Sequence, residues 1–199
     1  NVSAKIIVFA PSVEDIYQGK TLAEHFDFEG LENQMEGKHR PGHFDGVGTI
    51  VKRLFEIVQP NKAYFGEKDF QQLQIVKKLV SKYNIPVDVI GCPIHREVNG
   101  LAMSSRNERL SESAREKAAI IYQILNSAKE IFQTNSAEQT IKFVENEFKK
   151  HPEFELEYFE IADEATLLPV SEKEFDKKYR GFIAIFIENI RLIDNISLN

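Results

Sequence analysis

The residue types best suited to chemistry in this sequence lie between Phe65 and Gln72. Gly66 is followed closely by a cation and a carboxylate, Lys68 and Asp69, directly after a short apolar run. Where a strand turns into a helix, free backbone N–H groups meet the positive end of the helix dipole, and such turns bind phosphates. The stretch therefore predicts a nucleotide-binding turn. A purely structural reading is also open, in which Asp69 caps the helix and Gln72 completes a capping box.

Two further segments combine glycines with cations or hydroxyl groups. In residues 100–107, GLAMSSRN, the hydroxyls of Ser104 and Ser105 and the guanidinium of Arg106 suit phosphate oxygens, although the composition alone equally fits a polar linker. Residues 36–47 are glycine-rich and cationic and lead into a helix, where His43 is either a general base or metal ligand, or a polar residue of the helix entry. The five histidines lack metal-ligand spacing, so we predict no protein-ligated metal.

An alternation of strands and helices in the first half of the chain must position residues 36–47 and 65–72. Apolar residues at helical spacing predict helices over 47–58 and 70–83, and apolar runs predict strands over 4–10, 62–65 and 87–90, with residues 20–42 mostly in loops. This order is typical of a parallel sheet with right-handed crossovers. Since the chain begins at Asn1 without methionine and enters a strand almost at once, we expect a doubly wound α/β unit that is incomplete at its N-terminus.

The second half of the chain has a different pattern. Ser113 and Glu116 have the spacing of a capping box ahead of a helix that reaches Phe132, and a second helix is expected over 136–150. Strands are expected over 155–161, 182–187 and 190–193, which together with the helices predicts a small α+β domain. We place the domain boundary so that residues 1–95 form the first domain and residues 96–199 the second.

The bulk properties of the chain restrict its partners and its compartment. The net charge of −6 and the pI of about 5.5 argue against a nucleic-acid partner. No apolar run approaches the roughly 20 residues of a membrane span, and no signal peptide is visible. The single cysteine, Cys92, excludes an internal disulfide and is expected in the core. These observations predict a cytoplasmic protein without nucleic-acid or membrane partners.

Three segments, taken in order, resemble the pantoate–β-alanine ligase (pantothenate synthetase) family. They are residues 36–44, 65–72 and 100–107, and the ending RLIDN at residues 191–195 is similar as well. Each motif alone is moderately specific, whereas the three in this order and spacing are highly specific, and the resemblance covers essentially the whole chain. It implies a Rossmann-like nucleotidyltransferase fold followed by the small α+β domain, and a homodimer.

The activity implied by the resemblance is an ATP-dependent ligation in pantothenate biosynthesis. The pantoate carboxylate attacks the α-phosphorus of ATP to give pantoyl adenylate and pyrophosphate, and the β-alanine amine then displaces AMP. Mg²⁺ accompanies ATP, held largely by phosphates and water. Because both nucleophiles belong to the substrates, the protein has to align the reactants and stabilise developing charge.

The resemblance also implies roles for individual residues. Lys68 would contact the phosphates, Asp69 the ribose and the backbone at His95 the adenine, while residues 103–106 would form a mobile phosphate-side loop. Gln72 would bind pantoate, Val47 and neighbouring apolar residues would line the pocket for its methyl groups, and Arg40 is a weaker candidate for organising that pocket. The full expected ATP-binding set is Gly66, Glu67, Lys68, Asp69, His95, Met103, Ser104, Ser105 and Arg106.

The sequence departs from the family pattern in one respect. The family's His-x-Gly-His motif, and a glutamine that contacts both pantoate and β-alanine, belong upstream of anything here, and His39 and His43 match a different family segment. We therefore expect no catalytic side chain within these residues, and the resemblance does not imply that this chain is active alone. Two alternatives stay open: another adenylyltransferase of the superfamily, which would need further cations for a phosphorylated substrate, and a non-catalytic module for dimerisation or weak nucleotide binding.

Overall fold

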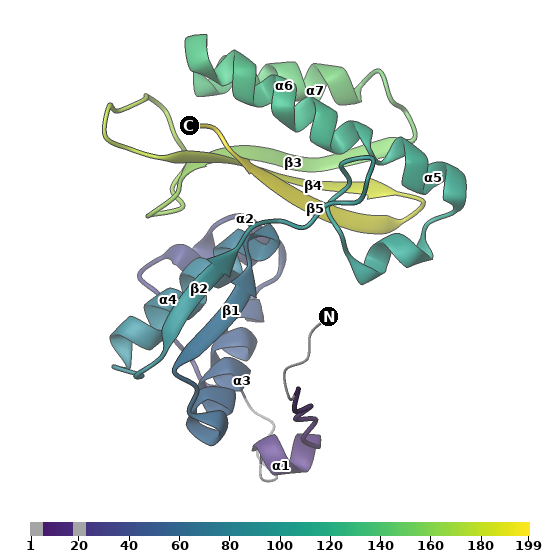
Figure 1. The fold of residues 1–199 in the computed structure, drawn as a ribbon. Helices are drawn as coiled ribbons and strands as arrows, with labels where there is room; N and C mark the ends of the chain where they lie inside the picture. The colour runs from purple at the N-terminus through teal and green to yellow at the C-terminus, as the bar shows by residue number, and fades with distance from the viewer. Residues whose placement is uncertain (1–5, 18–22) are drawn as a thin grey trace.

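Two sheets, each with its own helices, make up the protein (Figure 1). The computed structural model describes residues 6–17 and 23–199. In the first half, β1 and β2 pair in parallel, with Lys62 opposite Asp88. The elements here are α1 (Val13–Tyr17), η1 (Leu31–Asn33), α2 (Met35–His39), α3 (His43–Val58), β1 (Lys62–Gly66), η2 (Glu67–Asp69), α4 (Phe70–Lys82) and β2 (Asp88–Cys92).

Apolar side chains of α3 and α4 form the core of this first half. Phe44 of α3 packs in one cluster with Phe70, Leu73 and Leu79 of α4, as the helical spacing predicts. α3 ends at Val58, and Gln59 adopts the left-handed conformation ahead of Pro60. The order β1–α4–β2 is the parallel crossover expected from the sequence.

The second half is an antiparallel sheet of order β3–β4–β5, with α6 and α7 packed over one face (Figure 1). Ser136 caps α7 in a capping box with Gln139. The elements are η3 (Ser105–Arg109), α5 (Glu112–Lys117), α6 (Ile120–Thr134), α7 (Ala137–Phe148), β3 (Phe154–Asp163), β4 (Tyr179–Ile187) and β5 (Ile190–Ser197). The predicted α+β character of this half is confirmed.

The two halves share a core through the other face of the antiparallel sheet. Ala162 of β3 and Phe182 of β4 belong to the same buried cluster as α4, and the ring centroids of Phe182 and Phe70 lie 5.9 Å apart. β4 is consequently buried on both faces over most of its length. The division of the chain at residue 95 into two domains stays a prediction.

Several local predictions are wrong. Residues 4 and 5 of the expected first strand lie outside the described residues, while residues 6–10 form no strand and are exposed, because no neighbouring strand in the described chain pairs with them. Residues 20–42 are mostly irregular in their described part, as expected, apart from the short helices η1 and α2. Cys92 is only partly buried, because it ends β2 rather than packing inside the core.

Both capping predictions for the helices near the nucleotide motifs fail as well. The Asp69 side chain makes no capping hydrogen bond, so the capping box with Gln72 does not form. Asp69 is instead exposed at the end of η2. Ser111 rather than Ser113 caps α5, accepting from the Ala114 N–H, and α6 begins as a separate helix. Within the described ranges, no helix has the length and apolar character needed to cross a membrane.

Candidate active site

A cavity of about 270 Å³ lies where the two halves of the molecule meet. Its walls come from α2, the start of α3, the η2–α4 turn, η3 and all three antiparallel strands. The polar lining residues are Glu36, Arg40, His43, Lys68, Asp69, Gln71, Gln72, Arg106, Tyr158, Asp194 and Asn195. A hollow with a few convergent polar groups is the usual form of a small-molecule site.

Lys68 is the central cation of this cavity. Burial lowers the pKa of its ammonium group below the ordinary value of 10.5, and the Arg106 guanidinium acts in the same direction, against the opposing effects of Asp69 and Asp194. Lys68 and Arg106 also line a smaller adjoining hollow together with Ser104. Two cations and a hydroxyl thus converge in one place, which suits an oligophosphate.

The wall formed by α2 is held by a charge network around Glu36. Its carboxylate accepts from Arg191 Nη1 and Nη2 at 3.0 and 2.7 Å and from the Tyr158 hydroxyl at 2.8 Å. Burial by itself would raise the pKa of Glu36, but the hydrogen bonds from Arg191 and Tyr158 hold it below the ordinary value of 4.5. Arg191 also pairs with Glu157, so α2 is joined to both β3 and β5.

Arg40 and His43 stand at the mouth of the cavity, where α2 gives way to α3. Arg40 Nη1 lies 3.3 Å from His43 Nε2. Partial burial, helped by the Arg40 charge, lowers the pKa of His43 below its ordinary value of 6.5, so its imidazole is neutral at pH 7. Because a guanidinium can only donate, His43 Nε2 accepts from Arg40, and the Nδ1–H of the neutral imidazole is left as a donor for a ligand.

Gln71 and Gln72, the first two glutamines of α4, have different surroundings. Gln71 is buried and braces the loop before α2, because its amide donates to the carbonyls of Leu31 and Gln34 and its Oε1 accepts from the Glu36 N–H. Gln72 is partly exposed and lines the cavity. The structure therefore leaves Gln72 as the glutamine available to a ligand.

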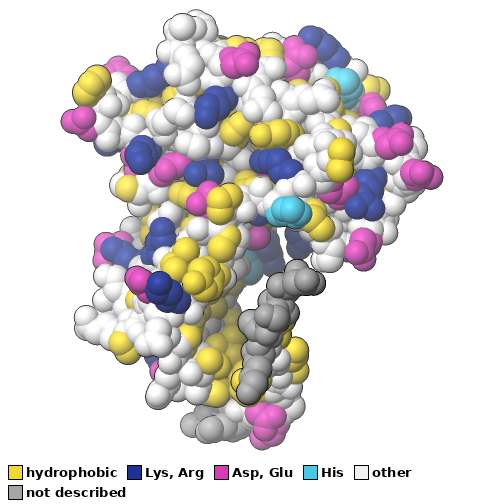
Figure 2. All heavy atoms as spheres, in the orientation of Figure 1, with side chains coloured by type: hydrophobic (Ala, Val, Ile, Leu, Met, Phe, Trp, Pro, Cys, Tyr) yellow, Lys and Arg dark blue, Asp and Glu magenta, His cyan; other side chains and the backbone are white. Residues whose placement is uncertain are grey.

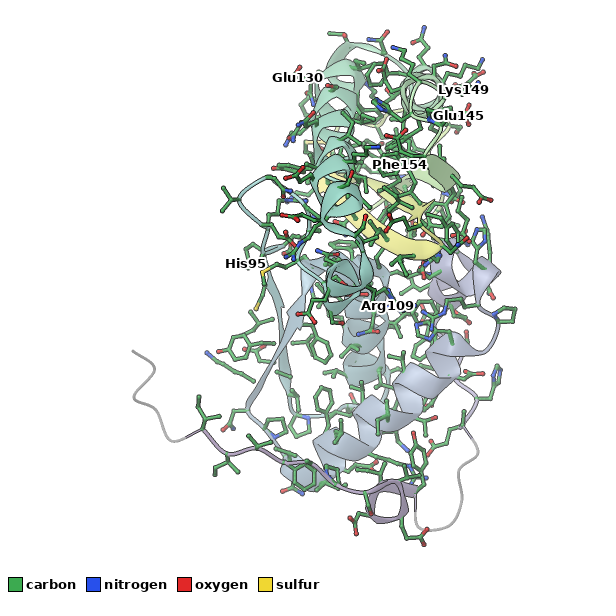
Figure 3. All side chains as sticks on the ribbon, turned by 90° about the vertical axis from the view of Figure 1, so that its right-hand side faces the viewer. His95, Arg109, Glu130, Glu145, Lys149 and Phe154 are labelled. Atoms are coloured by element: carbon green, nitrogen blue, oxygen red, sulfur yellow. The ribbon has the colours of Figure 1, made fainter. Side chains whose placement is uncertain are left out.

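The cavity brings together only part of the site expected from the sequence. Lys68, Asp69, Gln72, Arg106 and Arg40 line it, and Ser104 lines the adjoining hollow. The cavity lining does not include Gly66, Glu67, His95, Met103, Ser105 or Val47. Val47 instead packs against the core between α3 and the strands. The exposed His95 lies where the two halves connect (Figure 3).

Five polar residues of the cavity had no role assigned from the sequence: Glu36, Gln71, Tyr158, Asp194 and Asn195. Four of them lie in motifs already noted, since residues 36–44, residues 65–72 and the RLIDN ending were all matched. Tyr158 gives no such signal, because a tyrosine on a half-buried strand is usual. Among the described residues, no group of three or more histidine, cysteine or acidic side chains could hold a metal ion.

A parallel strand–helix unit that presents a half-buried lysine, with an arginine-bearing loop on the same cavity, defines a nucleotide-dependent enzyme of the Rossmann-like nucleotidyltransferase class. The family model for pantoate–β-alanine ligase matches residues 2–197. A pantothenate synthetase of Flavobacterium psychrophilum is 64% identical over 98% of this chain and 69% of its own length. That of Christiangramia forsetii is 57% identical over 99% and 70%. The chain belongs to the pantoate–β-alanine ligase family.

Solved structures agree with this assignment. The pantothenate synthetase of Thermus thermophilus superposes with a TM-score of 0.87 and 42% identity, over 96% of this chain and 68% of that one. The pantoate–β-alanine ligase of Francisella tularensis, described as complexed with β,γ-ATP and β-alanine, gives a TM-score of 0.67 and 32% identity, over 93% and 62%. The predicted family and fold class are thereby confirmed.

Proposed function

We propose that the cavity between the two sheets is where this protein carries out its family's reaction, the ATP-dependent condensation of pantoate with β-alanine to give pantothenate. The observation that supports this site most directly is the convergence of Lys68, Arg106 and Gln72 on one hollow. The first two are cations for phosphates, and the third offers both a donor and an acceptor for a hydroxy acid.

In the first step, a carboxylate oxygen of pantoate bonds to the α-phosphorus of ATP, and the bond from that phosphorus to the bridging oxygen of pyrophosphate breaks. Negative charge grows on the phosphoryl oxygens and on the leaving pyrophosphate. Lys68 and Arg106 stand where they can stabilise this charge, and a partly desolvated ammonium acts more strongly than one in water. Gln72 would orient pantoate by hydrogen bonds to its hydroxyl or carboxylate groups.

In the second step, the β-alanine amine bonds to the acyl carbon, the bond from that carbon to the AMP oxygen breaks, and the amine loses a proton. No protein nucleophile is required. The protein's contribution is to hold the adenylate, exclude water and keep the amine close to it. Asp69, which is exposed beside Lys68 and lines the cavity, would contact the nucleotide ribose.

ATP would arrive with Mg²⁺. Mg²⁺ keeps several waters and would bind largely through the substrate phosphates, so it would need no dedicated set of protein ligands. When bound, the ion would neutralise phosphate charge.

Two further proposals follow from the resemblance, that the protein is a homodimer and that it works in the cytoplasm. Sedimentation of the purified protein tests the first of these.

The experiment that tests the proposed function measures AMP release by the natural protein that carries this sequence. AMP should form only when ATP, pantoate and β-alanine are all present, and pyrophosphate should form with ATP and pantoate alone. ATP turnover that is indifferent to pantoate would contradict the proposal. Turnover with a phosphorylated substrate in place of pantoate would favour the rival adenylyltransferase, and no ATP binding at millimolar concentration would favour the non-catalytic module.

The residue assignments are tested by comparing Lys68→Ala with Gln72→Ala. Removing the phosphate-facing cation should lower the rate of adenylate formation by roughly 100-fold, as loss of one charge-stabilising donor does. Removing the amide should raise the KM for pantoate with little change in the KM for ATP. Lys77→Ala and Gln74→Ala serve as matched controls on α4, because neither residue lines the cavity. Wild-type kinetics in both test variants would show the assignments to be wrong.

A further inference from the structure

Two adjacent buried residues of β5, Asp194 and Asn195, contact both phosphate-side segments of the chain. Asn195 Nδ2 donates one hydrogen bond to the Glu67 carbonyl and one to the Lys68 carbonyl, each 2.9 Å long. A side-chain amide has two N–H donors, so both are used on consecutive residues of η2. The backbone that carries Lys68 is therefore held from the opposite sheet, 127 residues away along the chain.

The orientation of the Asn195 amide is itself fixed. Its Oδ1 accepts from Arg180 Nη1 at 2.7 Å, and Arg180 Nε pairs with Glu164 at 2.9 Å. The Arg180 guanidinium also lies 4.1 Å from the centre of the Phe70 ring. Since every polar atom of the Asn195 side chain has a partner, the amide cannot turn without losing buried hydrogen bonds, which are costly to leave unmade.

Asp194 contacts the other segment through Arg96. Its carboxylate accepts from Arg96 Nη1 and Nη2 at 2.6 and 3.0 Å, and Arg96 also donates to the Gly100 carbonyl at 3.1 Å. The same guanidinium stacks 3.7 Å from the centre of the Tyr122 ring. Gly100 has φ of +94°, which suits glycine and lets the chain turn back here.

Residues 96–102 form a short hairpin that leads directly into the loop that carries Arg106. Arg96 bridges to Ala102, and the Met103 N–H donates to the His95 carbonyl at 2.9 Å. The next residues along the chain are Ser104 to Arg106. Asp194 thus fixes the base of the loop that presents Arg106, while its Oδ1 also accepts from the Asn195 N–H at 2.8 Å.

We propose that Asp194 and Asn195 are positioning residues of the ligase reaction, which set the spacing between Lys68 and Arg106 across the phosphate site. Asn195 holds the backbone that carries Lys68, and Asp194, through Arg96, holds the hairpin that leads to Arg106. This inference rests on the proposed function of the cavity. A site that binds a transition state gains from cations whose places are fixed before the ligand arrives, and displacement by about 1 Å is expected to cost up to roughly 100-fold in rate.

Asn195→Asp tests the inference in the natural protein, because it keeps the side-chain shape but removes both donors to η2. We expect the KM for ATP to rise and adenylate formation to slow by roughly 10- to 100-fold, while the KM for pantoate stays unchanged. Glu164→Gln is the matched control: it weakens the same buried network at Arg180 without touching the η2 carbonyls. It should therefore lower the melting temperature without changing the ratio of the two KM values.

Arg96→Lys gives an independent reading from the other segment, since it keeps the charge but loses the forked contact to Asp194. This variant too should raise the KM for ATP and leave the KM for pantoate unchanged. It provides the test if Asn195→Asp does not fold. An equal loss for both substrates, in proportion to the loss of melting temperature, would overturn the inference. Wild-type protein without pantoate-dependent AMP formation would instead contradict the proposed function, so the two failures are distinguishable.

Discussion

At the scale of single residues, the protein places its ionisable groups in surroundings that change their behaviour. Lys68 loses water and gains a nearby guanidinium, whereas Glu36 loses water but gains two strong donors. The same burial therefore has opposite outcomes: the lysine becomes easier to deprotonate, and the glutamate stays ionised. The hydrogen-bonding and charged neighbours of a side chain, more than its burial, therefore decide its charge in the cavity.

The lowered pKa of Lys68 makes ATP binding sensitive to alkaline pH. A lysine binds phosphate as a cation, which is the form present below its pKa. Because that pKa lies below its ordinary value of 10.5 in the ligand-free protein, ATP affinity should begin to fall at lower pH than an exposed lysine would give, by about tenfold for each pH unit beyond the pKa. Calorimetric titration with ATP from pH 7.5 upward measures this.

Lys68→Arg is the control for this prediction, because a guanidinium stays charged throughout the range. Whatever its ATP affinity at pH 7.5, the curve for this variant should be flat where the wild type falls. A wild-type curve as flat as that of the arginine variant would contradict the assignment of Lys68 to the phosphates.

At the scale of elements, sequence patterns predicted well the helices whose stability comes from one buried face. α3, α4, α6 and α7 were all expected from apolar spacing. β3 was expected from the alternation of residues 155–161, and strands were also expected at β4, which is buried on both faces, and at β5. The exposed segment at residues 6–10 has an equally apolar pattern but no partner strand in the described chain. A run of apolar residues predicts a tendency to form a strand. Whether that strand pairs with another depends on residues far away in the sequence.

The candidate site was predictable to the extent that its residues lie in local motifs. Lys68, Gln72 and Arg106 follow from their neighbours in sequence. Tyr158 and the role of Asn195 do not, because each depends on contacts across more than a hundred residues, to Glu36 and to the η2 carbonyls. Helix caps were missed for a related reason, since Ser111 and Ser113 are chemically equal candidates two residues apart.

Glu36 joins α2 to β3 and β5, so α2 should be sensitive to substitution of this residue. Glu36→Gln removes the charge that pairs with Arg191 but keeps one acceptor, so we expect a loss of roughly 1–3 kcal/mol in the free energy of unfolding. Denaturant titration at pH 7 measures the loss. Lys142 and Glu138 form an exposed pair on α7, so Glu138→Gln is a control expected to change little.

The pH dependence of this contribution has a definite sign. Since the pKa of Glu36 is lower in the folded protein than its ordinary 4.5, the stabilisation is complete above that value and is lost as the pH falls through the folded pKa. The difference in unfolding free energy between wild type and Glu36→Gln should therefore shrink on acidification below about pH 4.5. A difference that is constant from pH 7 to pH 3 would contradict the role of the carboxylate.

At the scale of the whole molecule, the two halves are joined by shared apolar surface as well as by ion pairs. Figure 2 shows charged side chains spread over the upper half, with apolar ones more prominent over the lower half, where β1 and β2 lie. Exposed apolar residues there include Tyr64 of β1 and residues 6–9. Inside, Phe182 connects the antiparallel sheet to the core of α4.

Phe182→Ala should therefore weaken the coupling between the halves. Deleting a buried aromatic ring typically costs about 3–5 kcal/mol, and here the loss falls on the surface between the two sheets. We expect a broadened or divided calorimetric transition in place of one cooperative transition. Leu125→Ala, in the α6 core alone, is the control: it should lower stability by a similar amount and leave the shape of the transition unchanged.

The position of β5 along the chain also matters for the growing polypeptide. The cavity wall includes Ile193, Asp194 and Asn195 of β5, which are made after all the other residues that line the cavity. During translation, η2 with Lys68 leaves the ribosome more than a hundred residues before these partners, so the nascent chain cannot assemble this pocket early. Substrate can then act as a folding ligand only once β5 has emerged, which ties nucleotide capture to a late stage of synthesis.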